Sequence, residues 1–283
     1  MTRAERHTLG SAVAPLSLIG GAAGPPLSLR LSITDRCQLR CLYCMPPEGV
    51  PLVSREEILS YEEITEVARA AAAMGVTRIR LTGGEPLVRR DVVRLVEMLA
   101  AVGGIGDLAM TTNGILLGRH ARQLAAAGLH RVNVSLDATD ADRYAEITRG
   151  GDVRQVLSGI EAARRAGLTP IRLNCVVESD AFEPDARDVA ALARSAGLEV
   201  RFIRRMDLAE GAFAVVEGGR GGDCPRCNRL RLTSDGGIRP CLFSNLSFSV
   251  RELGAARALA MAVHCKPWAG SACTDLAMPA IGG

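Results

Sequence analysis

Hydrophobic and polar positions between residues 27 and 207 follow two alternating patterns, short apolar runs and longer amphipathic stretches. The apolar runs predict strands, and apolar residues spaced three and four apart predict helices that end at Gly75, Gly128 and Gly167. A capping box opens the first helix, with Ser60 as N-cap and Glu63 reaching back to it. The predicted strands cover residues 29–33, 76–81, 108–112, 132–136, 171–177 and 198–203, and the predicted helices cover residues 60–75, 91–102, 119–127, 153–166 and 185–196.

This alternation predicts an α/β fold class. Six strand–helix units with short turns predict a parallel sheet with right-handed crossovers. A full barrel needs eight such units, so six predict an open, partial (βα)6 barrel of the TIM type over residues 27–207. A glycine-rich, poorly periodic segment follows, and we expect residues 208–283 to form a short C-terminal extension.

Polar residues recur where the predicted strands end. The carboxyl ends of parallel strands lie on one rim of the sheet, which is where such folds carry their chemistry. A single polar strand end is commonly an ordinary turn, whereas five on one rim predict a site. The five are Cys37, Thr82 to Glu85, Thr111 to Asn113, Ser135 with Asp137, and Met206 with Asp207.

Three cysteines follow the first predicted strand at once, Cys37, Cys41 and Cys44, in the spacing C-x3-C-x2-C. Three thiolates this close together can hold three corners of a [4Fe-4S] cluster and leave the fourth iron without a protein ligand. A cluster used only for electron transfer normally has four protein ligands, so the open iron predicts a site that binds substrate. The alternative is a zinc knuckle, but no histidine or fourth cysteine lies nearby to complete it.

The composition limits the classes of partner. The 283 residues carry a formal net charge of +3, which argues against nucleic acid or an anionic membrane as the main partner. No apolar run approaches the ~20 residues of a membrane span. Lys266 is the single lysine, and arginines make up the rest of the Lys and Arg total. Arginine binds phosphate in bidentate fashion, which suits an anionic small substrate. For most of these arginines, the simpler explanation is genome composition.

The first residues imitate a secretory signal peptide. Arg3 and Arg6 precede an apolar stretch over residues 9–19, and small residues follow it. Pro15 interrupts that stretch, however, and an oxygen-sensitive cluster site follows directly. We therefore predict a cytoplasmic protein whose residues 1–26 form a partly disordered leader.

A second set of cysteines lies in the C-terminal extension. Cys224, Cys227 and Cys241 have the spacing C-x2-C-x13-C, which again supplies three ligands rather than four. A second open cluster is one interpretation. The other is a four-cysteine zinc ribbon completed by Cys265 or Cys273.

The first cysteine set, Tyr43 before its last cysteine, and the sequence Gly83-Gly84-Glu85-Pro86 resemble the radical S-adenosylmethionine (SAM) superfamily. The second cysteine set, the sequence Arg229-x-Arg231 and the terminal Gly282-Gly283 narrow the resemblance to the MoaA family of GTP 3′,8-cyclases. The similarity covers residues 27–205, 224–248 and 278–283.

The resemblance implies cofactors and roles for individual residues. Two [4Fe-4S] clusters are implied, one held by Cys37, Cys41 and Cys44 and one held by Cys224, Cys227 and Cys241. The residues implied to bind SAM are Tyr43, Gly83, Gly84, Glu85, Ser135 and Met206. The residues implied to contact GTP are Arg30, Arg80, Thr111, Arg172, Arg229 and Arg231, and Gly282 and Gly283 are implied to assist catalysis.

Arg172 stands where the family has a lysine for the phosphates, so its charge is kept but its reach and geometry change. Alternatively, Arg30, Arg80 and Arg172 are surface residues of strands that pair with acids. A strand of a parallel sheet is expected to be buried on both faces, which favours the substrate role.

The implied reaction belongs to the lyase class and begins molybdenum-cofactor biosynthesis. An electron reduces the first cluster, SAM is cleaved, the 5′-deoxyadenosyl radical removes the hydrogen at C3′ of GTP, and the C3′ radical attacks C8 of guanine to give 3′,8-cyclo-7,8-dihydro-GTP. The implied partners are GTP and an electron donor such as flavodoxin or ferredoxin. Neither nucleic acid nor a membrane is implied, and the question of a homodimer stays open.

The chain also departs from the family pattern. Several dozen residues that typical members have between Met206 and Cys224 are absent, so we expect a poorly shielded second cluster. Two other functions therefore stay open. One is a radical SAM enzyme with an auxiliary cluster that acts on another substrate such as a peptide, with Cys265 and Cys273 as further ligands. The other is a zinc-binding module without enzymatic activity.

Overall fold

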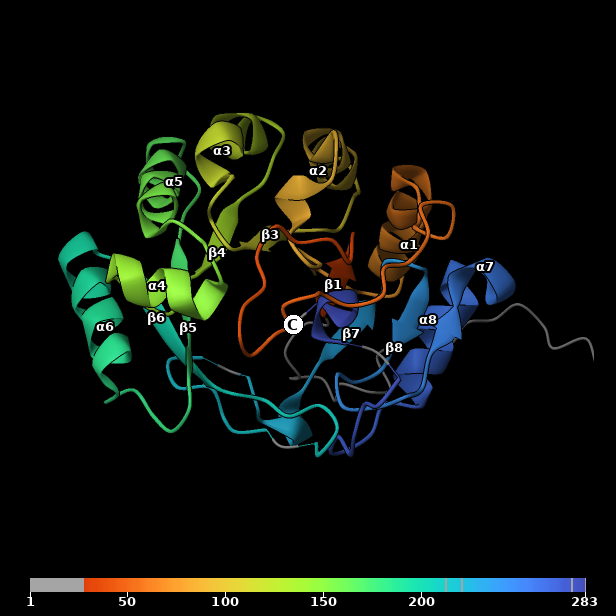
Figure 1. The fold of residues 1–283 in the computed structure, drawn as a ribbon. Helices are drawn as coiled ribbons and strands as arrows, with labels where there is room; N and C mark the ends of the chain where they lie inside the picture. The colour runs from red at the N-terminus through yellow and green to blue at the C-terminus, as the bar shows by residue number, and fades with distance from the viewer. Residues whose placement is uncertain (1–27, 212, 220, 276, 283) are drawn as a thin grey trace, which may run out of the picture.

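The computed structural model describes residues 28–211, 213–219, 221–275 and 277–282. The expected leader and Gly283 therefore lie outside the described residues. One sheet organises this part of the chain, in the order β6-β5-β4-β3-β2-β1-β7-β8-β9 (Figure 1). Its strands are β1 (Ser28–Ser32), β2 (Arg78–Thr82), β3 (Asp107–Thr112), β4 (Arg131–Ser135), β5 (Arg172–Val177), β6 (Glu199–Arg204), β7 (Arg229–Leu232), β8 (Gly237–Arg239) and β9 (Phe248–Ser249).

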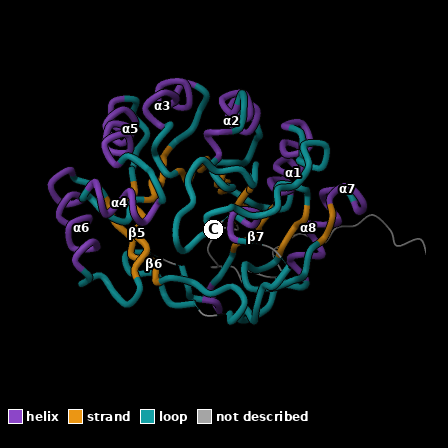
Figure 2. Tube along the Cα trace, in the orientation of Figure 1, coloured by secondary structure: helices purple, strands orange, loops and turns teal. Residues whose placement is uncertain are grey.

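Strands β1 to β6 are parallel, which confirms the predicted partial (βα)6 barrel. Strand β7 pairs parallel with β1, and β8 and β9 continue antiparallel, so the sheet runs on into the predicted C-terminal extension. The sheet curves into an open arch with helices on its outer side (Figures 1 and 2). The helices are α1 (Tyr61–Ala73), α2 (Val92–Ala100), α3 (Leu117–Ala126), α4 (Ala141–Thr148), α5 (Val153–Arg165), α6 (Pro184–Ala196), α7 (Val250–Leu253), α8 (Ala255–His264) and α9 (Met278–Ile281).

The predicted helices are all present, and the predicted capping box at Ser60 and Glu63 is confirmed in α1. Helices α4, α7, α8 and α9 are not among the sequence predictions. None of the helices in the described ranges is long and apolar enough to span a membrane.

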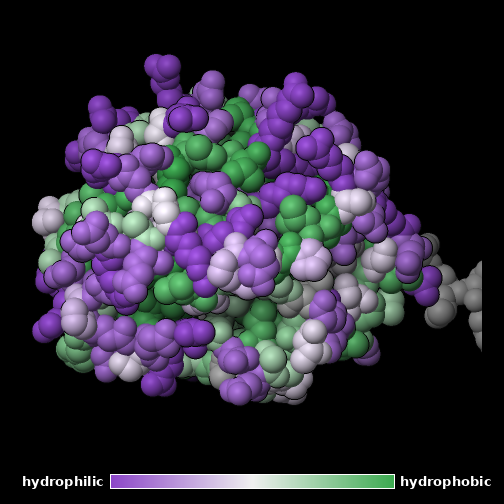
Figure 3. Space-filling view, in the orientation of Figure 1, coloured by the Kyte–Doolittle hydropathy of each residue, from purple (hydrophilic) through white to green (hydrophobic). Residues whose placement is uncertain are grey.

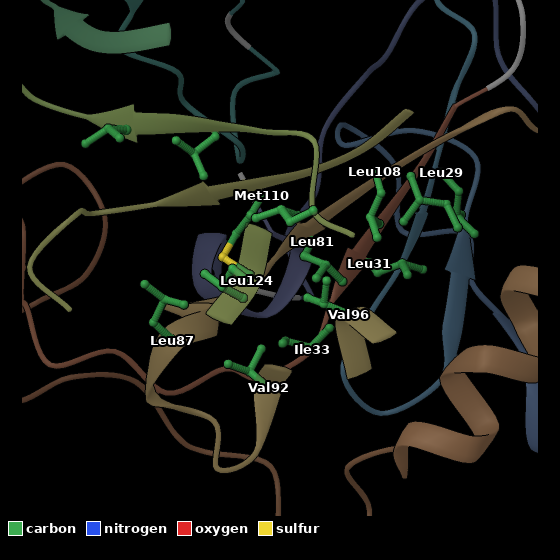
Figure 4. Packing of buried hydrophobic residues seen from close by; sticks show 14 of the residues in the cluster. Leu29, Leu31, Ile33, Leu81, Leu87, Val92, Val96, Leu108, Met110 and Leu124 are labelled. Atoms are coloured by element: carbon green, nitrogen blue, oxygen red, sulfur yellow. The ribbon is translucent and has the colours of Figure 1, made fainter. Parts of the chain in front are cut away.

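Alternation along β1 separates the core from the inner face of the arch. Leu29, Leu31 and Ile33 are fully buried and pack with Leu81, Val92 and Leu108 between sheet and helices (Figure 4). Successive side chains of a strand point to opposite faces, so the residue between Leu29 and Leu31 points into the arch. That residue is Arg30.

Candidate active site inside the arch

A single cavity of about 1570 Å³ runs along the inner face of the sheet. It extends from Arg78, Arg131 and Arg172 at the beginnings of their strands to Thr82 and Ser135 at the ends. The residues that the resemblance implies to hold the clusters, SAM or GTP all line this cavity, whereas Asp137, Asp207 and Gly282 do not, and Gly283 is undescribed. The two cysteine sets and the residues implied to bind SAM and GTP therefore face one shared space.

Helix α4 holds the loop of the first cysteine set in place. The backbone amides of Arg40 and Leu42 donate to the carbonyls of Thr148 (3.2 Å) and Ile147 (2.9 Å) at the end of α4. Arg149, the next residue, donates from its guanidinium to the carbonyls of Arg40 (2.8 Å) and Met45 (2.8 Å), which flank the stretch from Cys41 to Cys44. Arg149 has a left-handed backbone with φ of 54°, so its conformation is costly and is fixed by these contacts.

The donor set of this loop fits an iron–sulfur cluster. Cys37, Cys41 and Cys44 are free thiols that are partly exposed to the cavity. Burial, together with neighbouring acidic groups, raises the pKa of Cys41 to about 12, and burial raises that of Cys44 to about 12 as well. Such thiols become thiolates only against a strong positive charge, which iron supplies, and an all-sulfur donor set is the chemistry of iron–sulfur clusters.

Gly83 and Gly84 lie directly against the backbone of the cysteine loop. The amide of Gly84 donates to the carbonyl of Thr34 at 2.7 Å, and that of Glu85 donates to the carbonyl of Arg36 at 2.8 Å. A Cβ on Gly83 would lie 2.4 Å from Thr34 O, and one on Gly84 would lie 2.4 Å from Arg36 O. Only glycine therefore permits this approach.

The Glu85 carboxylate ties the end of β2 to the end of β3. It accepts hydrogen bonds from the amide of Leu87 (3.0 Å), the hydroxyl of Thr112 (2.8 Å) and the amide of Asn113 (2.7 Å). Burial nevertheless raises its pKa to about 7. The side chain of Asn113 in turn donates to Cys37 Sγ at 3.8 Å. Glu85 thus positions a neighbour of the first cysteine.

Three arginines form a row across three neighbouring strands. In the register of the sheet, Arg30 of β1 lies beside Arg80 of β2 on one side and Arg231 of β7 on the other. Burial, together with repulsion from neighbouring arginines, lowers the pKa of Arg80 to about 9 and that of Arg231 to about 10. Within the described residues no carboxylate lies within ion-pair distance of Arg30 or Arg80. This uncompensated charge suits a polyanion.

Arg172 differs from that row because it forms an ion pair with Glu199. Arg172 thus pairs with an acid, as the alternative interpretation of this residue expected. Its side chain is nevertheless only 18% exposed and lines the cavity, so it is not a surface residue. Six further arginines line the cavity that were not predicted from the sequence: Arg78, Arg131, Arg201, Arg204, Arg205 and Arg226. The period-two spacing of arginines along predicted strands was the signal that could have identified Arg78, because it lies two residues before Arg80.

The second cysteine set lines the same cavity. Cys224 and Cys227 flank a short 3-10 turn, and the sulfur of Cys241 accepts a hydrogen bond from the amide of Phe243 at 3.4 Å. Burial alone would raise the pKa of Cys227, but the charge of Lys266 and contacts with Arg229 outweigh it and lower the pKa.

The single lysine has a structural position here. Lys266 Nζ donates to the carbonyls of Arg229 (2.7 Å) and Pro240 (2.7 Å), which lie two residues after Cys227 and one residue before Cys241. Cys265 and Cys273 do not line the cavity. Across the described residues, no three His, Cys, Asp or Glu side chains are placed as ligands of one metal ion.

The C-terminal tail enters the arch (Figure 1). The carbonyl of Gly282 accepts a 2.5 Å hydrogen bond from the guanidinium of Arg231, which is 5% exposed. Gly282 has φ of 71°, and a Cβ there would lie 2.2 Å from the hydroxyl of Thr82. A residue without a side chain is therefore required at this position.

Comparisons with known proteins identify the family of this chain. A model of the radical SAM superfamily matches residues 31–199. The chain is 43% identical over 293 residues to the GTP 3′,8-cyclase of Moorella thermoacetica, covering 84% of this chain and 90% of that protein. It is 39% identical over 266 residues to the GTP 3′,8-cyclase of Alkaliphilus oremlandii, covering 79% and 83%.

The crystal structure of Streptococcus suis SuiB bound to S-adenosylmethionine superimposes with a TM-score of 0.64 at 15% identity, covering 86% of this chain and 64% of that one. This similarity shows the fold. The protein is thus a radical SAM enzyme by fold and sequence. It belongs to the GTP 3′,8-cyclase family, as the resemblance implied.

The chain is a shortened member of that family. Because 84% of this chain is about 238 residues, an alignment of 293 positions leaves about 55 residues of the Moorella thermoacetica protein without a counterpart here. In the described ranges, the segment from Met206 to Cys224 folds back on β6 through a bridge between Phe202 and Glu217 and lines the cavity.

Proposed function

We propose that this protein converts GTP to 3′,8-cyclo-7,8-dihydro-GTP, the first step of molybdenum-cofactor biosynthesis. The observation that carries the proposal is the row of Arg80, Arg30 and Arg231, which opens into the same cavity as both cysteine sets. A triphosphate supplies the negative charge that these buried guanidinium groups lack. The alternative of a peptide substrate has less support, because the curated relatives described above are GTP 3′,8-cyclases.

The cofactors are two [4Fe-4S] clusters and SAM. Cys37, Cys41 and Cys44 would hold the first cluster, and Cys224, Cys227 and Cys241 would hold the second. When bound, the first cluster and SAM supply a 5′-deoxyadenosyl radical that removes the C3′ hydrogen of GTP. The chain's own contribution is to hold the two small molecules in reacting positions and to exclude water.

The SAM-binding assignments rest on residues around the first cysteine loop. Tyr43 would place its ring beside the adenine, and the backbone of Gly83 and Gly84 would face the amino group. Ser135 and Met206 line the same cavity as these residues. Glu85 would act by holding this end of the sheet, since its carboxylate oxygens already accept three hydrogen bonds from the protein.

The remaining assignments concern GTP and the tail. Arg30, Arg80, Arg172, Arg229 and Arg231 would bind the phosphates and the guanine, and Thr111 would contact the ribose side of the nucleotide. Gly282 and Gly283 would complete the wall of the site, with Gly282 held by Arg231. The charge of the phosphates changes little during the reaction, so arginines that neutralise it would chiefly strengthen substrate binding.

We further propose a cytoplasmic enzyme that takes its electron from a donor such as flavodoxin or ferredoxin and has no nucleic-acid or membrane partner. Residues 27–207 would form the catalytic barrel and residues 208–283 the second-cluster region. Self-association into a homodimer is a separate hypothesis that sedimentation at several protein concentrations tests.

The testing experiment measures iron, sulfide and zinc in anaerobically reconstituted wild type and in the triple variant Cys224→Ala, Cys227→Ala, Cys241→Ala. We expect about eight irons to fall to about four. Wild type should convert GTP to the cyclised product with SAM and dithionite, and the triple variant should not. About four irons plus one zinc that the variant loses would contradict the second cluster and with it the GTP assignment.

A further inference from the structure

The outer surface carries a basic groove between α3 and α5, separate from the central cavity. Its volume is about 690 Å³. Gly118, Ala121 and Ala162 form a floor of small residues, and no acidic residue is among those that line it. The charged residues of this α3–α5 groove are Arg119, Arg122, Arg154 and Arg165.

The two arginines of α3 provide uncompensated charge. Arg119 and Arg122 are exposed and lie three positions apart, so they share one face of the helix. On α5, Arg154 pairs with Asp152 and Arg165 pairs with Glu161. In the described part of the chain, no salt bridge involves either α3 arginine. Hydrophilic side chains project along the upper rim of the molecule, where Figure 1 places α3 and α5 (Figure 3).

One end of the groove reaches the first cysteine loop. Ile115 lines the groove and donates its amide to the side-chain oxygen of Asn113 at 3.1 Å. The same side chain accepts from Gln38 at 3.2 Å and donates to Cys37 Sγ at 3.8 Å. Two residues of chain span at most ~7 Å. The groove therefore begins a short step from the sulfur of Cys37, on the outside of the protein.

The opposite side of the cysteine loop has the opposite charge. Glu48, Glu56 and Glu57 are exposed between the loop and α1, where Arg55 is the one exposed cation among residues 45–60, so this segment is net negative. An acidic macromolecule that approaches the loop is repelled on the α1 side and attracted on the α3–α5 side. The overall net charge of +3 is too small to explain such a directional field by itself.

From these observations we infer that the α3–α5 groove is the docking surface for an acidic protein that delivers single electrons to the first cluster. The inference rests on the proposed function, because only the reductive step of that reaction requires an electron from outside. Arg119 and Arg122 attract and orient the donor, and the donor's redox group then faces the Cys37 side. The electron passes from the reduced donor, which is oxidised, to the oxidised cluster, which is reduced, and no bond forms between the proteins.

The test compares wild type with Arg119→Glu/Arg122→Glu, using reduced flavodoxin as the acidic donor and dithionite as a small reductant. The matched control is Arg69→Glu/Arg257→Glu, which reverses two exposed arginines on α1 and α8. We expect the groove variant to bind flavodoxin about tenfold more weakly and to be reduced by it correspondingly more slowly. Added salt should shrink this difference, while reduction by dithionite should be unchanged.

Flavodoxin binding is measured by surface plasmon resonance, and cluster reduction by visible absorbance, so neither reading requires GTP. Unchanged flavodoxin binding in the groove variant overturns the inference. So does an equal loss in the control variant, or a parallel loss of dithionite reduction. A change of oligomeric state with unchanged flavodoxin binding also overturns it and assigns the groove to a second copy of the chain. Absence of cyclised product with dithionite contradicts the proposed function and leaves the binding result intact.

Discussion

The phenol of Tyr43 donates a 2.7 Å hydrogen bond to the Oδ2 atom of Asp137, which is 5% exposed. The other carboxylate oxygen accepts from the backbone amide of Val176 on β5 at 2.8 Å. Burial raises the pKa of Asp137 to about 6. Asp137 therefore connects the aromatic residue of the cysteine loop to the sheet and fixes where its ring lies in the cavity.

We predict that Asp137→Ala weakens SAM binding by roughly tenfold to a hundredfold, because it removes a hydrogen bond to a charged group worth about 1.5–3 kcal/mol. Asp137→Asn keeps the shape and the acceptor for Val176, so its loss should be smaller. Equilibrium dialysis with labelled SAM measures the dissociation constant. The control is Tyr43→Phe, which keeps the ring and removes only the hydroxyl. Wild-type affinity in Asp137→Ala would show that this hydrogen bond does not position the site.

Arg231 donates a hydrogen bond to the tail carbonyl of Gly282, and we propose that it also binds GTP. We predict that Arg231→Ala retains both clusters and uncoupled SAM cleavage but binds GTP roughly tenfold to a hundredfold more weakly, as expected for the loss of a charge-assisted hydrogen bond. Isothermal titration with GTP measures this. Unchanged GTP affinity would remove the main reason for assigning GTP to this cavity.

The next prediction concerns the C-terminal tail and distinguishes a steric clash at Gly282 from the strain of a positive φ. We expect Gly282→Ala, and deletion of Gly282 and Gly283, to abolish cyclised product without unfolding the protein, because a Cβ at Gly282 would clash with Thr82 at 2.2 Å. The control is Gly75→Ala, since Gly75 also has a positive φ (91°) but has no atom within 4 Å of the added Cβ. The control should cost about 1 kcal/mol of stability and keep its activity. Full product formation by the truncated chain would contradict a role for the tail.

The sequence predicted the six barrel strands and five of the helices because their apolar runs are long and their ends are marked by glycine or by a cap. Helix α4 escaped because it spans eight residues and buries only Tyr144, Ile147 and Thr148, too few for a recognisable period. Strands β7 to β9 are two to four residues long. Their place in the sheet depends on the pairing of β7 with β1, which is distant in sequence, since β8 pairs with β7 and β9 with β8.

The site was predictable as a set of residues, but its geometry was not. Spacing identified both cysteine sets, and resemblance supplied Arg30, Arg80 and Arg231. That these three form one row follows only from the pairing of β1 with β2 and with β7. The partners that fix the cysteine loop, Arg149 and Asp137, contact it across about a hundred residues of chain.

Helix α4, which was not predicted from the sequence, leads to a prediction about the first cluster. Arg149 holds the carbonyls of Arg40 and Met45 from the end of α4, so Arg149→Ala should leave the cysteine loop loose and lower the iron content bound by the first set, measured in the triple Cys→Ala background of the second set. Arg149→Gly relieves the left-handed backbone at φ of 54° but also lacks the guanidinium. Both variants should lose iron. Full iron content in Arg149→Gly would show that Arg149 matters only through its backbone.

The confirmed capping box of α1 predicts a pH-dependent stability. Hydrogen bonds from Arg251 and from Ser60 lower the pKa of Glu63 to about 2, despite the opposing effect of burial. A depressed acid pKa stabilises the fold above the unfolded value of about 4.3, and this contribution is lost as the pH falls toward 2. Urea unfolding of the metal-free protein should therefore show Glu63→Gln less stable than wild type at pH values above 5, with the difference shrinking at pH values below 4. Ser60→Ala should cost about 1 kcal/mol at neutral pH. A difference between wild type and Glu63→Gln that is constant with pH would mean that the carboxylate charge contributes nothing to α1.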